Sequence, residues 1–241
     1  MKIVTIHQPE HMPWLGFFNK MSQADVYILL DSVQFKTGNW QNRNRIVGKD
    51  GAPQWLTVPC LTTNHTRSTI RDIEIDDARQ WRAKYKGRIR DAYRDYPFYD
   101  AYCGDIFAII DGGHRKIADL NGDLIAYFRA VLGLAGRPEI LKSSELAGAG
   151  KATDLLVALI LEVGGGGYIA GADGVKYMDM DTFAANGIEV FFHHYRPFAY
   201  AAPNGYQPCM STLDALFALG ADGLAGRDRE ANGFGAPPPP G

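Results

Sequence analysis

The sequence has few cysteines and no long apolar run. Its 241 residues include three cysteines, Cys60, Cys103 and Cys209, and no two of them form a Cys-x-x-Cys pair. This excludes a disulfide-stapled mini-protein and argues against a metal site built on cysteines. The longest apolar stretches, such as residues 26–30 and 155–161, fall far short of the roughly 20 residues that a membrane helix needs. The amino-terminal stretch is too polar for a signal peptide. We therefore expect a cytoplasmic protein with no membrane association.

A large excess of charge of one sign is also missing. The chain has 25 Lys and Arg residues and 27 Asp and Glu residues, so its net charge is −2. A net charge this close to zero does not indicate that the protein surface as a whole binds nucleic acid. The charge is uneven, however, since residues 1–97 hold 15 basic and 10 acidic residues and residues 98–241 hold 10 and 17. The basic half suggests an anionic ligand such as a phosphate, and a solvated basic helix explains the same charge equally well.

Strand and helix patterns alternate along the chain. The apolar runs predict buried strands at 2–6, 25–30, 139–142, 168–170 and 188–192, with helices between them, and a further strand at 70–75. Two short strand patterns, 44–47 and 54–58, surround a Gly/Pro-rich turn and predict a hairpin. The alternation predicts an α/β fold, a Rossmann-like doubly wound, mostly parallel sheet with an inserted β-hairpin and a helical segment.

Composition also sets the expected domain limits. Residues 1–220 are predicted to form a single α/β domain with a helical insertion at about 78–133. Residues 221–241 are rich in Gly, Ala and Pro and end in a run of four prolines. That composition predicts a disordered tail.

The loop after the first predicted strand is the richest in polar side chains. Ligands of doubly wound sheets bind beyond the carboxyl ends of the strands. This loop carries His7, Gln8, His11 and Trp14. A histidine has a pKa near neutrality and is therefore suited to act as a general base, so His7 and His11 are catalytic candidates. Pro9 lies between them and argues against a metal-binding pair on a helix, so no metal is expected. The alternative is that the prolines fix a tight turn and the histidines are hydrogen-bonded within it.

Residues 8–14 are similar to the QPxHxGH segment of nucleotidylyltransferases. In those enzymes two histidines and a helix N-terminus stabilise the phosphates of a nucleotide. Here Pro13 stands in place of the Gly and Trp14 in place of the second His. The similarity supports a Rossmann-like start more than it supports nucleotidyl transfer.

A second polar cluster spans residues 30–46. It contains Asp31, Gln34, Asn42 and Arg43 among several further amides. Amide and charged groups at this density suit a polar ligand such as a sugar, an amino acid or a phosphate. A hydrophilic surface loop is the alternative, and the interleaved aromatic residues of this cluster argue against it.

Several segments together resemble the WbqC-like protein family. They are HQPEHMPWLGFFNKMSQADVYILLDSVQF, NWQNRNRI, WLTVP, KSSEL, YIAG, GVKYMD and STLDALFALG. Members occur in bacterial O-antigen and related biosynthetic clusters. The resemblance implies a transferase that moves an acyl or aminoacyl group, such as glycyl, to a sugar or similar acceptor. The shared motif positions are here His7, Gln8, Pro9, Trp14, Gly16, Lys20, Asp31, Gln34, Asn42 and Arg43. Members usually have an aromatic residue where this chain has His11, and Val where it has Cys60.

Two mechanisms fit the implied reaction. In the first, Cys60 at the end of the segment WLTVP forms a thioester with the acyl group, with His7, His11 or His65 as its base. A small buried thiol is the alternative for Cys60. In the second, His7 or His11 deprotonates the attacking amine, and Asn42 and Arg43 hold the acceptor or an oxyanion. We prefer this direct transfer.

Further residues are expected to bind substrate. Lys20 and the basic helix 79–94 would contact the phosphates of coenzyme A, a carrier-protein arm or a nucleotide sugar. Ser144 and Tyr177 follow other predicted strands and are candidates for the same pocket.

The expected protein is therefore a biosynthetic acyl or aminoacyl transferase. Its donor would be a thioester or an aminoacyl-tRNA, its acceptor a small-molecule amine, and an acyl or aminoacyl carrier protein or a charged tRNA its partner. No tightly bound cofactor is expected. One alternative is a nucleotidylyltransferase-like enzyme that uses a nucleoside triphosphate and Mg²⁺. Another is a non-catalytic module that binds a sugar or a carrier protein.

Overall fold

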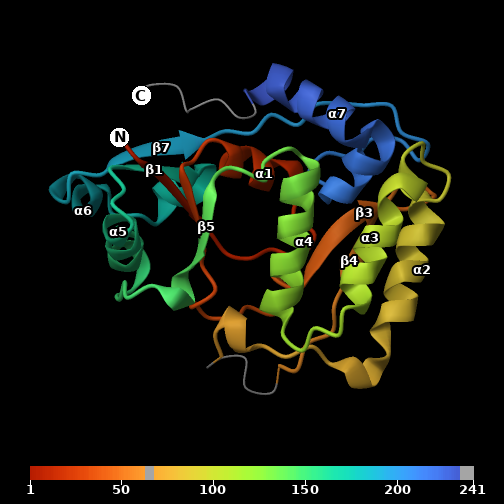
Figure 1. Cartoon of the computed structure of the whole chain (residues 1–241), viewed down its shortest axis with the longest axis horizontal. Coiled ribbons are helices and arrows are strands. Elements are labelled where there is room, and N and C mark those ends of the chain that lie inside the picture. Colours follow the sequence, from red (N-terminus) through yellow and green to blue (C-terminus); the bar gives the residue numbers. More distant parts are fainter. Residues whose placement is uncertain (63–67, 234–241) are drawn as a thin grey trace.

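Five parallel strands form the central sheet. The computed structural model describes residues 1–62 and 68–233. The strand order is β5–β2–β1–β6–β7 (Figure 1). Their bounds are β1 Ile3–His7, β2 Val26–Leu29, β5 Glu139–Lys142, β6 Gly167–Gly171 and β7 Glu189–His193. The chain runs outward from β1 to β2 and β5 and then returns to β6 and β7. The predicted Rossmann-like α/β fold is confirmed, and the order reverses between β1 and β6, which is where such sheets bind ligands.

Helices cover both faces of this sheet. Alternate residues of a strand point to opposite faces, and in β2 Val26 and Ile28 belong to one apolar cluster while Tyr27 and Leu29 belong to the other. Helix α5 (Ala152–Glu162) and helix α6 (Met180–Ala185) contribute to the first cluster. Helix α1 (Leu15–Ser22) contributes to the second. Because both faces are covered, the strands are continuous apolar runs rather than alternating ones.

A large insertion separates β2 from β5. It begins with the antiparallel hairpin of β3 (Arg43–Val47) and β4 (Pro53–Thr57), as the sequence predicts. Helices α2 (Trp81–Tyr93), α3 (Tyr99–Asp111) and α4 (Ile117–Val131) follow. The strand predicted at 70–75 is wrong. This segment has a 3-10 turn, η1 (Ile70–Asp72), and then only isolated bridges, so its buried isoleucines reflect packing rather than a sheet.

The carboxyl-terminal helix extends beyond the predicted domain end. Helix α7 spans Thr212–Asn232, so the disordered tail predicted from residue 221 is wrong as far as residue 232. Gly220 has φ +67°, a left-handed conformation that suits glycine, and it kinks the helix. Beyond the kink Leu224 and Asp228 are buried. Residues 234–241 lie outside the described residues.

Short 3-10 helices occupy several connections. They are η2 (Asp77–Arg79), η3 (Ser143–Glu145) and η4 (Ala172–Lys176). Within residues 1–62 and 68–233, no helix is long and apolar enough to cross a membrane.

Candidate functional site

Two buried asparagines hold the loop that joins β1 to α1. Asn121 of α4 donates from its amide nitrogen to the carbonyl of Pro9 at 3.1 Å and to that of Gln41 at 2.8 Å. Asn44 of β3 donates to the carbonyl of Met12 at 2.8 Å. Met12 itself has φ +46°, a conformation uncommon for a residue with a side chain. The insertion therefore fixes the shape of a loop that lies at the carboxyl end of β1.

His7, the last residue of β1, forms a pair with Glu10. The His7 Nε2 atom lies 3.2 Å from a carboxylate oxygen of Glu10. The His7 side chain is 30% exposed and that of Glu10 is 11% exposed, so the pair lies at the edge of the interior. The other ring nitrogen, Nδ1, is enclosed and has no hydrogen-bond partner among the described residues. Glu10 thus orients the ring with Nε2–H toward the carboxylate, which leaves the lone pair on Nδ1.

Burial and a neighbouring cation keep the His7 ring neutral. Burial lowers the pKa of His7, the positive charge of Lys20 lowers it further, and the contact with Glu10 opposes both effects. Lys20 is 4% exposed, and its ammonium donates to the carbonyl of Ile6 at 3.3 Å. Burial lowers the pKa of Lys20 to about 8. Lys20 therefore lies beneath the loop and not on a surface where it could contact a large phosphorylated donor, which corrects the sequence prediction for this residue.

His193, the last residue of β7, lies close to the same groups. Its Nε2 atom is 2.7 Å from the side-chain oxygen of Asn19. Burial lowers the pKa of His193 to about 4, and Lys20, His194 and His7 act in the same direction. The sequence places His193 and His194 at the end of a strand, and the structure turns His193 inward while His194 is exposed.

His11, the second histidine of the loop, lies in the core. It is 0% exposed. Its Nδ1 atom lies 2.9 Å from the side-chain oxygen of Asn121, and its Nε2 atom lies 2.6 Å from the hydroxyl of Tyr85. Burial lowers the pKa of His11 to about 4. Because both nitrogens are bonded within the core, the position of His11 favours the hydrogen-bonded alternative over the predicted catalytic role.

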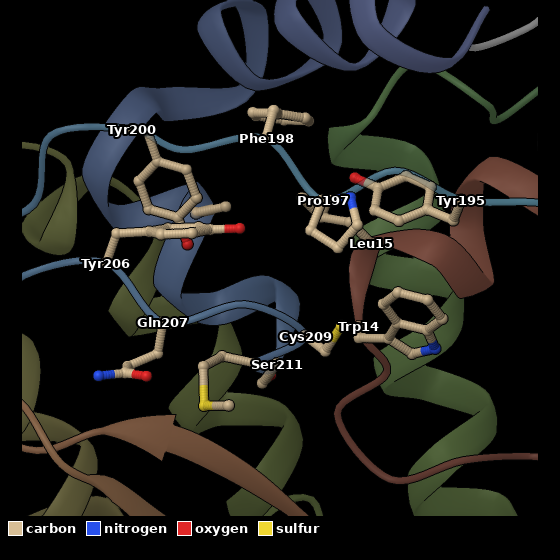
Figure 2. A pocket seen from close by; sticks show the side chains of 12 residues that line it. Trp14, Leu15, Tyr195, Pro197, Phe198, Tyr200, Tyr206, Gln207, Cys209 and Ser211 are labelled. Carbon is tan, nitrogen blue, oxygen red and sulfur yellow. The ribbon is translucent and has the colours of Figure 1, made fainter.

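Trp14 ends the loop and lines two cavities, one together with Tyr195 and the other together with Glu10. The ring packs edge-on against Tyr195 at 5.2 Å between ring centroids. Figure 2 shows it beside Tyr195 and Cys209, which belong to the segment 194–211 between β7 and α7. A Cβ atom on Gly16 would clash with the Trp14 ring, so a larger residue here would displace the indole.

One of the cavities lined by Trp14 is also lined by Glu10. It has a volume of about 220 Å³ and is lined by Glu10, Trp14, Trp40, Asn44, Arg45 and Cys209. Trp40 lies in the segment just before β3, and Arg45 belongs to β3. The insertion thus completes a pocket that begins at the end of β1.

A further cavity, which Trp14 does not line, lies at the carboxyl ends of β2 and β5. Its volume is about 430 Å³, and it is lined by Pro9, Leu29, Asp31, Arg71, Asp72, Lys116, Ala118, Asp119, Gly122, Lys142, Ser144 and Glu145. Asp31, after β2, accepts from the Ser144 hydroxyl at 2.8 Å, from the Ser144 amide at 3.0 Å and from the Ser143 hydroxyl at 3.1 Å. The predicted residues Asp31 and Ser144 therefore come together, and their hydrogen bonds tie the carboxyl ends of β2 and β5.

The other predicted substrate-binding residues are divided. Gln8 accepts a hydrogen bond from Gln41 at 2.7 Å, next to the loop. Asn42 donates to the carbonyl of Val58 at 2.8 Å, so its amide nitrogen supports the hairpin. Arg43 stacks on Trp55 on the outer side of the hairpin. Gln34 is exposed and pairs with the chain at Thr69 in an isolated bridge.

Tyr177 does not join the site. Its side chain follows η4 and is 71% exposed. The prediction that it binds substrate is therefore not supported by its position.

Cys60 lacks the properties of a nucleophile. Burial raises the pKa of its thiol to about 12, and the charge of Asp76 adds to the effect. A nucleophilic cysteine needs a lowered pKa, because the thiolate is the reactive form. The sulfur approaches the Val58 carbonyl at 3.7 Å. Residues 63–67, which include the candidate base His65, lie outside the described residues. Cys60 is half-buried and packs against the core, which favours the alternative of a structural thiol over the predicted catalytic role.

Three groups in the site were not assigned from the sequence. Glu10 is separated from His7 by two residues of a proline-containing loop, and only the loop geometry brings the two side chains together. Arg45 and Trp40 come to the same pocket because the hairpin folds back over the loop. The sequence indicated Arg45 and Trp40 only as members of the dense polar and aromatic cluster at residues 30–46. No group of three or more His, Cys, Asp or Glu side chains suited to a metal ion occurs in the described part of the chain.

Comparison with known proteins finds matches that cover most of the chain. A model of the WbqC-like protein family matches residues 8–225. The uncharacterized protein Rv1507c of Mycobacterium tuberculosis (strain ATCC 25618 / H37Rv) is 30% identical over 226 residues, which is 92% of this chain and 96% of that protein. No solved structure matches the chain.

Proposed function

Because this chain belongs to the WbqC-like protein family, we propose that it is a transferase that moves an acyl or aminoacyl group from an activated donor to an amine. The donor is a thioester or an aminoacyl-tRNA, and the transfer is direct. The observation that carries the proposal is the His7–Glu10 pair at the carboxyl end of β1, with a neutral imidazole and an enclosed Nδ1 that lacks a partner among the described residues.

His7 acts as the general base in this reaction. The amine nitrogen attacks the carbonyl carbon of the donor and forms the new C–N bond. The His7–Glu10 pair takes the proton that the nitrogen loses, and Glu10, which lines the cavity of about 220 Å³, is the member of the pair that faces the substrate. The C–S bond of a thioester, or the C–O bond of an aminoacyl ester, then breaks. The thiolate or ribose oxygen leaves and receives the proton from the pair, which returns to its starting protonation state.

Two features favour direct transfer over the alternatives. The raised pKa of Cys60 opposes a covalent thioester on this residue. For nucleotidyl transfer, the histidine of the similar segment would have to contact phosphate, and His11 is enclosed with both nitrogens bonded. A non-catalytic binding module would use the same pockets and would form no product.

The test is product detection with a donor panel. The full chain is incubated with aminoacyl thioesters or charged tRNA and with small amines, and new amides are identified by mass spectrometry. We expect an amide product from the wild-type chain and from Cys60→Ala, with no acyl adduct on the protein. His7→Asn should reduce the rate by about 10²- to 10⁴-fold, the range of general-base catalysis.

A surface pair provides the matched control. His114 lies 2.7 Å from Asp123, whose side chain is 64% exposed. His114→Asn therefore removes a histidine from a comparable His–carboxylate contact outside the site and should leave the rate unchanged. If no donor gives an amide, or if His7→Asn transfers as fast as the wild type, the proposal is wrong. Pyrophosphate released from ATP and Mg²⁺ would establish the nucleotidyl alternative instead.

A further inference from the structure

The outer side of the hairpin carries an alternating set of indoles and guanidinium groups. Trp40 and Trp55 lie 5.4 Å apart, measured between ring centroids, with a tilt of 35°. The guanidinium of Arg43 lies 4.1 Å from the Trp55 ring centre, and that of Arg45 lies 5.5 Å from Trp40 and 5.9 Å from Trp55. These distances are within the range of cation–π contact. We name these four residues the indole–guanidinium face.

The register of the hairpin explains why Arg43, Arg45 and Trp55 lie on the same side of it. Arg43 and Arg45 are two residues apart in β3, so both side chains point to the same side of the hairpin. Trp55 of β4 is directly opposite Arg45 in the antiparallel pairing. The carbonyl of Trp55 also accepts a hydrogen bond from Arg88 of α2 at 2.9 Å, which fixes the hairpin against the helix.

The two guanidinium groups lack acidic partners. Among the described residues neither Arg43 nor Arg45 forms an ion pair, and the Nε atom of each is enclosed without a hydrogen bond. Other arginines of the same chain, such as Arg79, Arg82 and Arg115, pair with carboxylates. Arg43 donates from Nη2 to the carbonyl of Gly38, and neither guanidinium has a carboxylate partner in an ion pair among the described residues.

The aromatic groups are also incompletely covered. Trp40 is 36% exposed and Trp55 is 39% exposed. A flat apolar ring would cover the indoles, and an anionic group would compensate the arginines. Nucleotides combine these two properties, since every base has a face that stacks on aromatic side chains and every phosphate binds guanidinium groups. A neutral sugar would stack on the indoles but leave the charge uncompensated.

We propose that the indole–guanidinium face binds a nucleotide unit, with its base on Trp40 and its phosphate on Arg43 and Arg45. The cavity of about 220 Å³ continues from Trp40 and Arg45 to Glu10. It is smaller than the roughly 300–1,000 Å³ of a complete small-molecule site, so it accommodates only part of a ligand. A ligand bound by its nucleotide on the hairpin therefore has its other end directed toward the His7–Glu10 pair.

This arrangement identifies the nucleotide as the handle of the activated donor, an assignment that rests on the proposed function. Coenzyme A and the 3′ end of a charged tRNA share this chemistry, because each carries its acyl group on a nucleotide. Binding of the nucleotide itself does not depend on transfer and can be measured alone.

The test is calorimetric titration of the full chain with AMP, using adenosine and ribose 5-phosphate as partial ligands. We expect saturable binding of AMP and at least tenfold weaker binding of either part. Trp40→Leu and Arg45→Gln should each weaken AMP binding by roughly tenfold to a hundredfold, the range seen when a stacking aromatic is removed. Trp40→Phe, which keeps an aromatic ring, should restore most of the affinity.

Two matched variants control for general effects. Arg115→Gln removes an arginine that pairs with Glu74, and Tyr177→Leu removes an exposed aromatic ring away from the face. Both should bind AMP within about twofold of the wild type.

Further titrations identify the source of the nucleotide. Tighter binding of coenzyme A than of AMP would assign a thioester donor, and tighter binding of a CCA ribotrinucleotide would assign a tRNA donor. The proposal is overturned if AMP, coenzyme A and the trinucleotide all fail to bind, if ribose 5-phosphate binds as well as AMP, or if Trp40→Leu and Arg45→Gln match the wild type. Nucleotide binding without amide formation would retain the site and refute only the transferase reaction.

Discussion

Replacing His11 should change the pH dependence of folding stability. His11 is enclosed, with Nδ1 bonded to Asn121 and Nε2 bonded to Tyr85. Its side chain is neutral in the folded protein because burial lowers its pKa to about 4. In the unfolded chain a histidine has a pKa of about 6.5. The unfolded state therefore binds an additional proton between these values, and the folded state is destabilised as the pH falls below about 6.5.

The size of the effect follows from the two pKa values. Each pH unit between them is worth about 1.4 kcal/mol of unfolding free energy. At pH 5, which is 1.5 units below the pKa of the unfolded state, the titration of His11 lowers the free energy of unfolding of the wild type by about 2 kcal/mol. The variant His11→Gln cannot titrate and does not lose this stability. At pH 8 the variant should be less stable by about 1–3 kcal/mol, because glutamine leaves the Tyr85 hydroxyl or the Asn121 oxygen without a partner.

Urea unfolding at several pH values measures this difference. We expect the stability gap between the wild type and His11→Gln to shrink by about 2 kcal/mol between pH 8 and pH 5. Comparing the two proteins at each pH removes the contribution of other groups. Among these is Asp214, whose pKa burial raises to about 6, so its contribution to stability is lost as the pH rises through 6. A gap that stays constant within about 0.5 kcal/mol would show that His11 titrates normally, and would refute its assignment to the core.

Two further predictions concern packing around the site and the end of the chain. Gly16→Ala should displace the Trp14 indole and cost about 1–3 kcal/mol through overpacking, visible as a shift in tryptophan emission and a lower Tm. Gly87→Ala in α2, where a Cβ meets nothing within 4 Å, should leave both unchanged or raise Tm. Leu224→Ala should cost about 2–5 kcal/mol in chemical denaturation, whereas Arg227→Ala on the exposed side should change stability by less than about 0.5 kcal/mol. Equal stability of these two variants would contradict the packing of α7 beyond Gly220.

The sheet could be predicted because local pattern determines it. Each central strand is a short apolar run bounded by polar or glycine residues, and both of its faces are covered by helices. The rule that ligands bind beyond strand carboxyl ends selects the loop after β1 together with Asp31 and Ser144, and the structure brings Asp31 and Ser144 into hydrogen-bond contact. The strands and the polar groups that follow them could be predicted because both depend on sequence features within a few residues of each strand.

The roles of the two histidines could not be predicted in this way. His7 and His11 belong to one short loop, and what separates them is tertiary contact. The partners of His11 are 110 and 74 residues away in the sequence. Similarly, the composition of residues 221–232 predicts disorder, but Leu224 finds a buried position that no local pattern indicates. Long-range packing decided both outcomes.

The most direct test of the account is the pH dependence of kcat/KM for transfer by the wild type and by Lys20→Met. The pKa of His7 lies below its usual 6.5, in part because of the Lys20 charge. We therefore predict that the wild-type kcat/KM, expressed per unprotonated amine acceptor, is constant above pH 6.5 and falls at lower pH as His7 becomes protonated. Removing the Lys20 charge raises the pKa of His7, so the acid limb of Lys20→Met should move to higher pH. An acid limb that stays in place in Lys20→Met would contradict the claim that His7 is the base of this reaction.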